Sequence, residues 1–374
     1  MSQPSRVLIH PFVDFMLVGG LSIVTLIVFT VLTDVYHFKM TDAPTWAYIA
    51  AFFVNYPHFA YSYQLFYKSF WDRLSGQEET LIGKVRMVIA GLAVPVLMVG
   101  YFVWAFRGFH EEYLGYAVLI MQFTVGWHYV KQGYGALITH SVYKGIFYST
   151  WQKRILYINA YVLWLFSVIN MSWFFHLLTN KNRLLNQAYY DVPYTIPYFP
   201  PGWHLPMMLL TVITSIMAFF VILKVWLREK KGISVNGVTA YLCTLYIWVL
   251  IPYIHGAFFF FIPFFHSLQY LPFVFKYKKS EFIDENSKGG VFSANAKTWT
   301  MVIGFLLGGF VLGGVFMDWG PKWLDKSHDP WVLGFSDNAY LVSFLIFINI
   351  HHYFIDSAFW RRDNAKAQKY LFKS

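Results

Sequence analysis

Long hydrophobic runs separated by short polar segments dominate this chain. A membrane-spanning helix needs about 20 predominantly apolar residues, and most of the runs have that length. The run 237–275 is twice as long, and Pro252, Gly256 and Pro263 interrupt it, so we divide it into two spans with a tight reversal near His255–Gly256. The pattern predicts an all-α, polytopic membrane bundle, a single transmembrane domain of about ten helices, over 12–35, 45–68, 84–106, 112–136, 153–178, 205–227, 237–254, 257–275, 298–317 and 336–360.

Composition supports this prediction. Of the 374 residues, 57% are hydrophobic and 13% are charged, against about 25% charged in a soluble domain. The single cysteine, Cys243, falls within a predicted span. One cysteine excludes both an internal disulfide and a thiolate metal cluster.

The basic residues predict the orientation. Ten spans place both termini on one side, and that side receives 22 of the 29 Lys and Arg residues, against six on the other; Lys131 lies inside a segment. By the positive-inside rule, both termini are cytoplasmic, as in a bacterial inner-membrane protein. The net charge of +10 therefore follows from topology, and we expect membrane lipids as partners and no nucleic acid.

Several histidines lie at a common predicted depth. Ten residues separate His58 from Lys68 and His266 from Lys276, and ten or nine separate His351 or His352 from Arg361. At 1.5 Å per residue, these histidines lie about 14–15 Å from the cytoplasmic anchors. They can therefore meet in one layer.

Two further histidines extend this layer. His128 lies sixteen residues before Lys144, and we expect Gly133 and Gly135 to end or bend its helix early, which would bring it close to the same level. His10 lies at the cytoplasmic start of the first span and could cap the layer from below. The candidate metal ligands are His10, His58, His128, His266, His351 and His352.

Polar partners follow most of these histidines at helical spacing. An acid or amide three or four residues later lies on the same helix face. Such a group can orient a metal-bound ring through its other nitrogen. The candidate orienting residues are Asp14, Gln132, Gln269 and Asp356.

A simpler interpretation exists for each residue taken singly. One intramembrane histidine more often forms a hydrogen bond between helices than it binds metal, and Asp14 and Asp356 could be solvated at helix ends. Five histidines from four helices at one depth are harder to explain independently, because polar residues within a membrane are costly and usually face a bundle interior. The set therefore favours a shared metal or cofactor site.

Imidazole ligands without thiolate suit iron, zinc, copper or nickel. A closed zinc site could be structural, but a catalytic site keeps an open position. A metal held within the lipid implies a lipid-soluble substrate, and iron with oxygen is the common means of attacking a hydrocarbon or polyene. We therefore predict a non-haem iron-dependent membrane oxygenase, an oxidoreductase, with Tyr270 as a hydrogen-bond donor at the catalytic site.

Three short motifs carry a resemblance. HPFVD at His10–Asp14 resembles the H-G-x-x-D motif of the Brp/Blh family of membrane β-carotene dioxygenases. PHF at Pro57–Phe59 is similar to that family's second histidine motif, and FFHSLQY at Phe264–Tyr270 resembles its W-H-S-x-R-H. The resemblance implies cleavage of a carotenoid with O₂, with His10, His58 and His266 as iron ligands. Tyr270 stands where the family has its final histidine.

Other functions have their own signatures. Fatty-acid desaturases carry H-x₃₋₄-H and H-x₂₋₃-H-H boxes, which this chain lacks. Haem needs only two histidines on facing helices and would leave the rest unexplained. A proton-coupled transporter could use the histidines as a relay, with Lys131 near His128, although snorkelling also explains that lysine.

Overall fold

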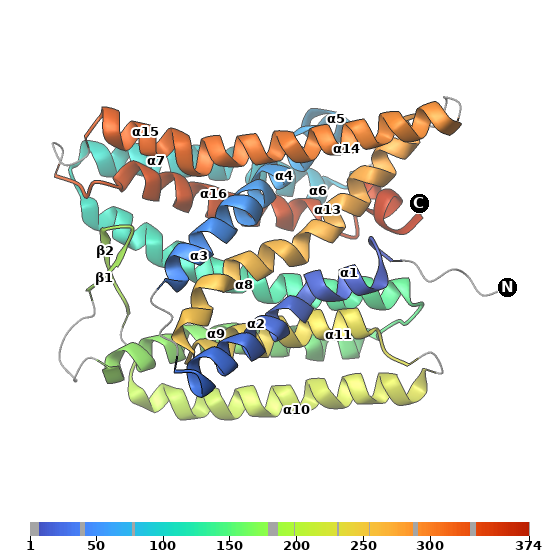
Figure 1. The fold of residues 1–374 in the computed structure, drawn as a ribbon, viewed down its shortest axis with the longest axis horizontal. Helices are drawn as coiled ribbons and strands as arrows, with labels where there is room; N and C mark the ends of the chain where they lie inside the picture. The colour runs from blue at the N-terminus through green and yellow to red at the C-terminus, as the bar shows by residue number, and fades with distance from the viewer. Residues whose placement is uncertain are drawn as a thin grey trace. The chain divides into compact units, whose positions relative to one another are not determined.

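The computed structural model describes residues 7–37, 42–76, 79–178, 186–197, 199–229, 232–253, 255–286, 291–329 and 334–373. Among these residues, the β-structure is one antiparallel hairpin of β1 (Asn186–Tyr189) and β2 (Val192–Thr195), in which Tyr189 pairs with Val192. Nearly all the rest is helical (Figure 1). The prediction of an all-α chain is therefore confirmed.

The helices of the N-terminal half are α1 (Pro11–Phe15), η1 (Met16–Gly20), α2 (Leu21–Thr30), η2 (Val31–Val35), α3 (Ala43–Ala50), η3 (Ala51–Asn55), α4 (Tyr56–Tyr67), α5 (Phe70–Ser75), α6 (Leu81–Val88), η4 (Ile89–Ala93), α7 (Val94–Arg107), α8 (Glu111–Tyr143) and α9 (Thr150–Leu178). Those that follow are η5 (Pro201–Trp203), α10 (His204–Arg228), α11 (Val235–Leu242), η6 (Cys243–Ile247), α12 (Trp248–Leu250), η7 (Ile251–Tyr253), η8 (Gly256–Phe261), α13 (Ile262–Asn286), α14 (Val291–Gly314), η9 (Val315–Trp319), α15 (Gly320–Ser327), α16 (Ala339–Phe359), α17 (Ala365–Gln368) and η11 (Lys369–Lys373).

Seven helices in the described residues are long and apolar enough to cross a membrane. This agrees with a multi-pass integral membrane protein. The described residues of the other predicted spans, 45–68, 112–136 and 237–254, are also largely helical. The first two carry polar residues such as His58 and His128, which lower their apolarity. The seven are Pro11–Val35, Leu81–Arg107, Thr150–Met171, Pro201–Arg228, Gly256–Asn286, Ala296–Ser327 and Ala339–Phe359.

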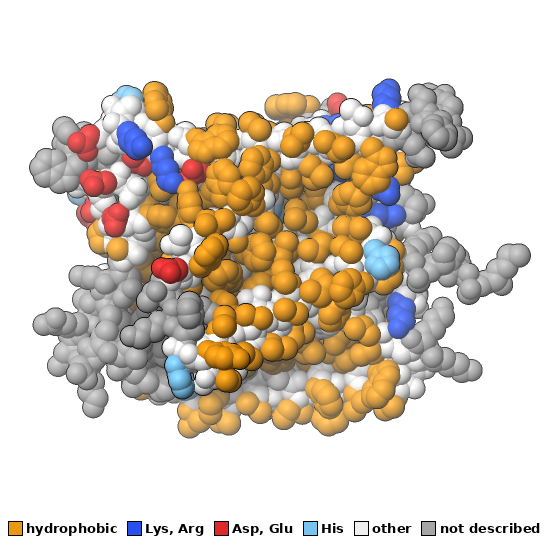
Figure 2. Space-filling view, viewed as in Figure 1, with side chains coloured by type: hydrophobic (Ala, Val, Ile, Leu, Met, Phe, Trp, Pro, Cys, Tyr) orange, Lys and Arg blue, Asp and Glu red, His pale blue; other side chains and the backbone are white. Residues whose placement is uncertain are grey.

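The surface has the character expected of lipid-facing helices. Hydrophobic side chains cover the length of the helices in Figure 2, and charged side chains gather toward the helix ends. Burial differs widely among the spans. In the apolar window of α16, 72% of the residues are buried, against 17% in Leu81–Arg107.

One local expectation was wrong. Gly133 and Gly135 do not end the fourth helix, because α8 continues to Tyr143. Instead, the missing side chain of Gly133 makes room for Thr244, since an added Cβ would lie 2.7 Å from the Cβ atom of Thr244. In a separate departure from run length, α13 continues to Asn286, beyond its apolar part.

The chain forms two compact units. The first comprises Met1–Ala51, Gly126–Leu185 and Ile196–Pro272, and the second comprises Phe52–Val125, Asn186–Thr195 and Phe273–Ser374. In the first unit, α9 packs along α10, where the amide of Asn159 donates to the hydroxyl of Thr214 over 3.3 Å. A buried apolar cluster follows these helices into α11 and η6, and it includes Leu156, Leu163, Ala218, Val221, Tyr241 and Leu245.

In the second unit, α4 packs closely against α14 (Figure 1). The glycines of α14 allow this approach, because a Cβ on Gly313 would lie 2.6 Å from the backbone of Tyr56. Tyr61 crosses the same interface and donates to the carbonyl of Leu306 over 3.1 Å. Gly309 and Gly313 therefore allow the close packing of these two helices.

Candidate metal site

His58 and His352 lie in direct ring contact in the second unit. Their ring centroids are 4.5 Å apart at an interplanar angle of 84°, and both side chains are fully buried. Pro57 and His58 form the first turn of α4, while His352 lies on α16, which packs along α4. Phe59 also touches the ring of His352, at 4.9 Å, so apolar packing holds the pair in place.

A carboxylate completes this group. Asp356 lies one turn after His352 on α16, and its Oδ2 atom lies 3.5 Å from Nε2 of His352. Ligand atoms of His352 lie within 4.8 Å of those of His58 and of Asp356. Two imidazoles and one carboxylate are the donor set of non-haem Fe(II) oxygenases, which leave positions open for O₂ and substrate.

A second histidine pair lies in the first unit. The rings of His128 on α8 and His266 on α13 have centroids 4.9 Å apart at 71°. Tyr129 stacks on His266, with centroids 4.1 Å apart and an interplanar angle of 25°. This stack restricts the rotation of the His266 ring.

The two glutamines next to this pair fix the backbone. Nε2 of Gln132 donates to the carbonyl of His266 at 2.9 Å and to Oε1 of Gln269 at 3.1 Å. Nε2 of Gln269 in turn donates to the carbonyl of Val18 at 2.8 Å and to the hydroxyl of Thr244 at 3.2 Å. These amides therefore tie α8, α13, η1 and η6 together around the pair.

His351 belongs to neither pair and is held by tyrosines of the second unit. Its Nε2 lies 2.9 Å from the carbonyl oxygen of Ala90 and must donate to it. In the neutral ring, Nδ1 is then the acceptor, and the hydroxyl of Tyr63 donates to it over 2.7 Å. Tyr67 lies 3.4 Å from Nε2 and donates to the carbonyl of Gly91. Both nitrogens of His351 are therefore engaged.

The remaining predicted residues lie elsewhere. His10 is exposed at the N-cap of α1. The carboxylate of Asp14 accepts hydrogen bonds from the backbone N–H groups of Leu8 and Ile9, at 2.9 and 3.0 Å, and so fixes the start of the helix. Tyr270 is buried on α13, one turn after His266.

Three tyrosines at these histidines were not predicted. Tyr129 follows His128 directly, and Tyr63 and Tyr67 lie one helical turn apart on α4, which also carries His58. Their spacing was visible in the sequence. The abundance of tyrosine, 27 residues, concealed which of them meet a histidine.

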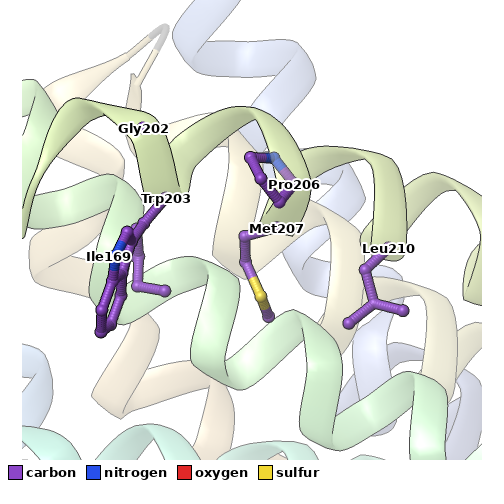
Figure 3. Close-up of a pocket in the computed structure, with 6 residues that line it drawn as sticks. All are labelled: Ile169, Gly202, Trp203, Pro206, Met207 and Leu210. Carbon is purple, nitrogen blue, oxygen red and sulfur yellow. The ribbon is translucent and has the colours of Figure 1, made fainter.

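None of the histidines described above lines the pocket drawn in Figure 3. It has a volume of about 260 Å³ in the first unit. The residues lining it are Ile169, Gly202, Trp203, Pro206, Met207 and Leu210, which supply neither an imidazole nor a carboxylate.

Comparison of the chain with protein-family models, with curated proteins and with solved structures finds no match.

Proposed function

We propose that this protein is a membrane-embedded oxygenase with a non-haem iron centre. The observation that carries the proposal is the buried group of His58, His352 and Asp356. When bound, Fe(II) would supply the activation of O₂. The two imidazoles and the carboxylate would hold the ion, and the surrounding apolar side chains would exclude water from it.

His128 and His266 are proposed as a further ligand pair. The amides of Gln132 and Gln269 hold the backbone around them, and Tyr129 holds the ring of His266. Tyr270 is proposed as a hydrogen-bond donor near the reaction. For His10 and His351, which the sequence suggested as ligands, we propose structural roles at the start of α1 and among the tyrosines of α4.

The proposed substrate is a lipid-soluble polyene or lipid. Many of the spans expose apolar side chains, so a substrate dissolved in the bilayer would meet the protein without crossing water. The resemblance to the Brp/Blh family rests on the motifs at His10, His58 and His266. It makes a carotenoid the first substrate to assay.

Haem is disfavoured by the geometry of each pair. The rings of His58 and His352 touch one another at a centroid distance of 4.5 Å, and those of His128 and His266 at 4.9 Å. A porphyrin between two axial histidines would have to separate the rings. Neither pair leaves that space.

We also propose a cytoplasmic location for both termini of ten spans in a bacterial inner membrane. The distribution of 22 against six basic residues supports it. A fluorescent protein fused after Ser374 should be bright in the cytoplasm, and alkaline phosphatase inserted within 179–204 should be active in the periplasm. A dark C-terminal fusion would contradict this topology.

The test of the function combines metal analysis with spectroscopy on detergent-purified protein. Wild type should contain iron in about a 1:1 or 2:1 ratio to protein, without a Soret band. His58→Ala, His352→Ala and Asp356→Asn should each lower the iron content, and His266→Ala measures the contribution of the other pair. His140→Ala is the matched control, because His140 is also buried on α8 but belongs to neither pair.

Iron-loaded wild type should then consume O₂ with a carotenoid or lipid substrate. Metal-free wild type after gentle purification would overturn the proposal and would favour a transporter that uses the histidines as a proton relay. Retention of iron in both His58→Ala and His352→Ala would remove the proposed ligand set.

A further inference from the structure

A pocket of about 490 Å³ lies in the second unit, between the end of α4 and the facing parts of α13 and α14. One wall is apolar and the other carries nitrogen donors. The residues lining it are Gln64, Lys68, Lys278, Phe282, Met301 and Phe305.

Ion pairs with two glutamates hold both lysines in place. Nζ of Lys278, which is 3% exposed, lies 2.6 Å from a carboxylate oxygen of Glu281. Nζ of Lys68 lies 3.3 Å from Glu281 and 3.0 Å from Glu285. Neither glutamate lines the pocket, so the polar groups presented to it are ammonium and amide groups.

These donors lie at the junction of the polar and apolar walls. Nζ of Lys278 lies 4.9 Å from the ring centre of Phe305 and 5.3 Å from that of Phe282. Nζ of Lys68 lies 5.5 Å from the ring of Phe282. Nε2 of Gln64 has no acceptor among the residues that the structure describes. An anionic group with an attached apolar chain would match both walls.

We infer that this pocket binds the phosphate headgroup of an anionic phospholipid, with an acyl chain against Phe282, Met301 and Phe305. Lys68 lines the pocket and marks the cytoplasmic boundary in the proposed topology, on which this inference rests. The cytoplasmic leaflet carries the anionic lipids, and basic pockets between membrane helices at that depth bind their headgroups. This inference is independent of the proposed iron chemistry.

The test is lipid retention by the full-length protein, measured by native mass spectrometry after titration with phosphatidylglycerol or phosphatidylcholine. Wild type should bind phosphatidylglycerol more tightly. Lys68→Met should weaken that binding about fivefold, the effect of about one surface lysine. Gln64→Leu, made as a separate variant, should also weaken it. Neither variant removes Lys278, whose loss could prevent folding.

Lys322→Met is the matched control. Lys322 also pairs with an acid, Asp318, over 2.6 Å in the second unit. The substitution therefore removes the same charge as Lys68→Met, but Lys322 lies on α15, outside the pocket. Equal binding of the two lipids, or an equal loss in Lys322→Met, would overturn the inference. Displacement of phosphatidylglycerol by millimolar inorganic phosphate would show a simple anion site and would also overturn it.

Discussion

The hydroxyl group of Tyr63 donates to Nδ1 of His351 over 2.7 Å. The next residue in sequence, His352, has different surroundings, because its Nε2 lies beside the carboxylate of Asp356. Adjacent residues on a helix point about 100° apart. The two histidines of one motif therefore enter different surroundings.

Removal of that hydroxyl should destabilise the protein and, under the proposed iron site, should leave the iron content unchanged. Tyr63→Phe leaves Nδ1 of His351 without its donor in a buried place, which costs about 1–3 kcal/mol. Thermal unfolding in detergent measures the cost, and Tyr116→Phe, at an exposed tyrosine of α8, is the control. Loss of bound iron in Tyr63→Phe would instead make His351 a ligand.

Added volume between α4 and α14 should destabilise the second unit. A Cβ on Gly313 would lie 2.6 Å from the backbone of Tyr56, and backbone cannot give way as a flexible side chain can. We expect Gly313→Ala to cost about 1–3 kcal/mol, measured by unfolding in mixed detergent. Gly304→Ala on the same helix is the control, because nothing lies within 4 Å of its added Cβ. Equal effects of the two substitutions would contradict this account.

The hydrogen bond between Gln132 and Gln269, 3.1 Å long, should give a measurable coupling energy. A double-mutant cycle of Gln132→Met and Gln269→Met isolates the pair. Hydrogen bonds between membrane helices contribute about 0.6 kcal/mol on average and up to about 1.7 kcal/mol, so we expect a value in that range. Additive effects of the two substitutions would show that the two amides stabilise the protein independently, through their other hydrogen bonds.

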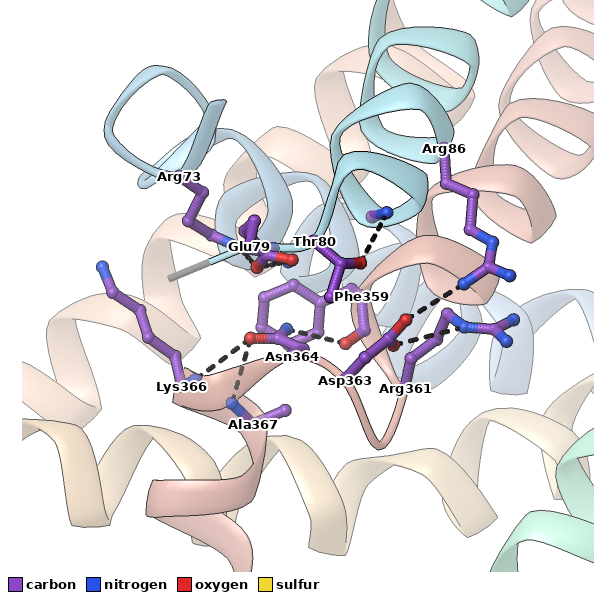
Figure 4. A network of polar contacts seen from close by, with 11 residues as sticks. Arg73, Glu79, Thr80, Arg86, Phe359, Arg361, Asp363, Asn364, Lys366 and Ala367 are labelled. Carbon is purple, nitrogen blue, oxygen red and sulfur yellow. Dashed lines mark hydrogen bonds and ion pairs between the residues drawn. The ribbon is translucent and has the colours of Figure 1, made fainter. Parts of the chain in front are cut away.

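The buried ion pair of Arg73 and Glu79 should contribute more to the free energy of unfolding than the exposed ion pair of Arg86 and Asp363. The Arg73 guanidinium contacts Glu79 over 2.6 Å, and both side chains are only 6% exposed (Figure 4). Glu79→Gln leaves a buried arginine without its counter-charge, at a cost of about 3–5 kcal/mol. Asp363→Asn breaks the pair with Arg86, in which both side chains are 36% exposed, and should cost less than about 1 kcal/mol. Comparison of the two unfolding transitions provides the measurement.

Hydrophobic run length predicted the helices well, because a bilayer imposes a minimum length that the sequence shows directly. It failed where polar residues continue a helix beyond its apolar part, as at Lys278 and Glu281 of α13. The expected helix end at Gly133, which rested on the low helix propensity of glycine, was also wrong. This position needs a small residue because it packs against Thr244.

Depth counting placed His58 and His352 at one level, and their rings do meet. Depth carries no information on which way a side chain points around its helix. That rotation separates His351 from His352, and it also decides that the carboxylate of Asp14 meets the backbone of Leu8 and Ile9. Rotation depends on the partner helices, which a single sequence does not reveal.

The heavily buried α16 has a consequence for biosynthesis. It follows α4, α6 and α7 in the chain and carries His351, His352 and Asp356. Ionisable residues such as these make the entry of a helix into lipid unfavourable. Since chains are made from the N-terminus, α4, α6 and α7 are already in the membrane when it arrives, and they pack against α16 in the finished protein. A chain truncated before Phe359 would leave these helices without α16. The unpaired helices would then be substrates for the quality-control proteases of the membrane.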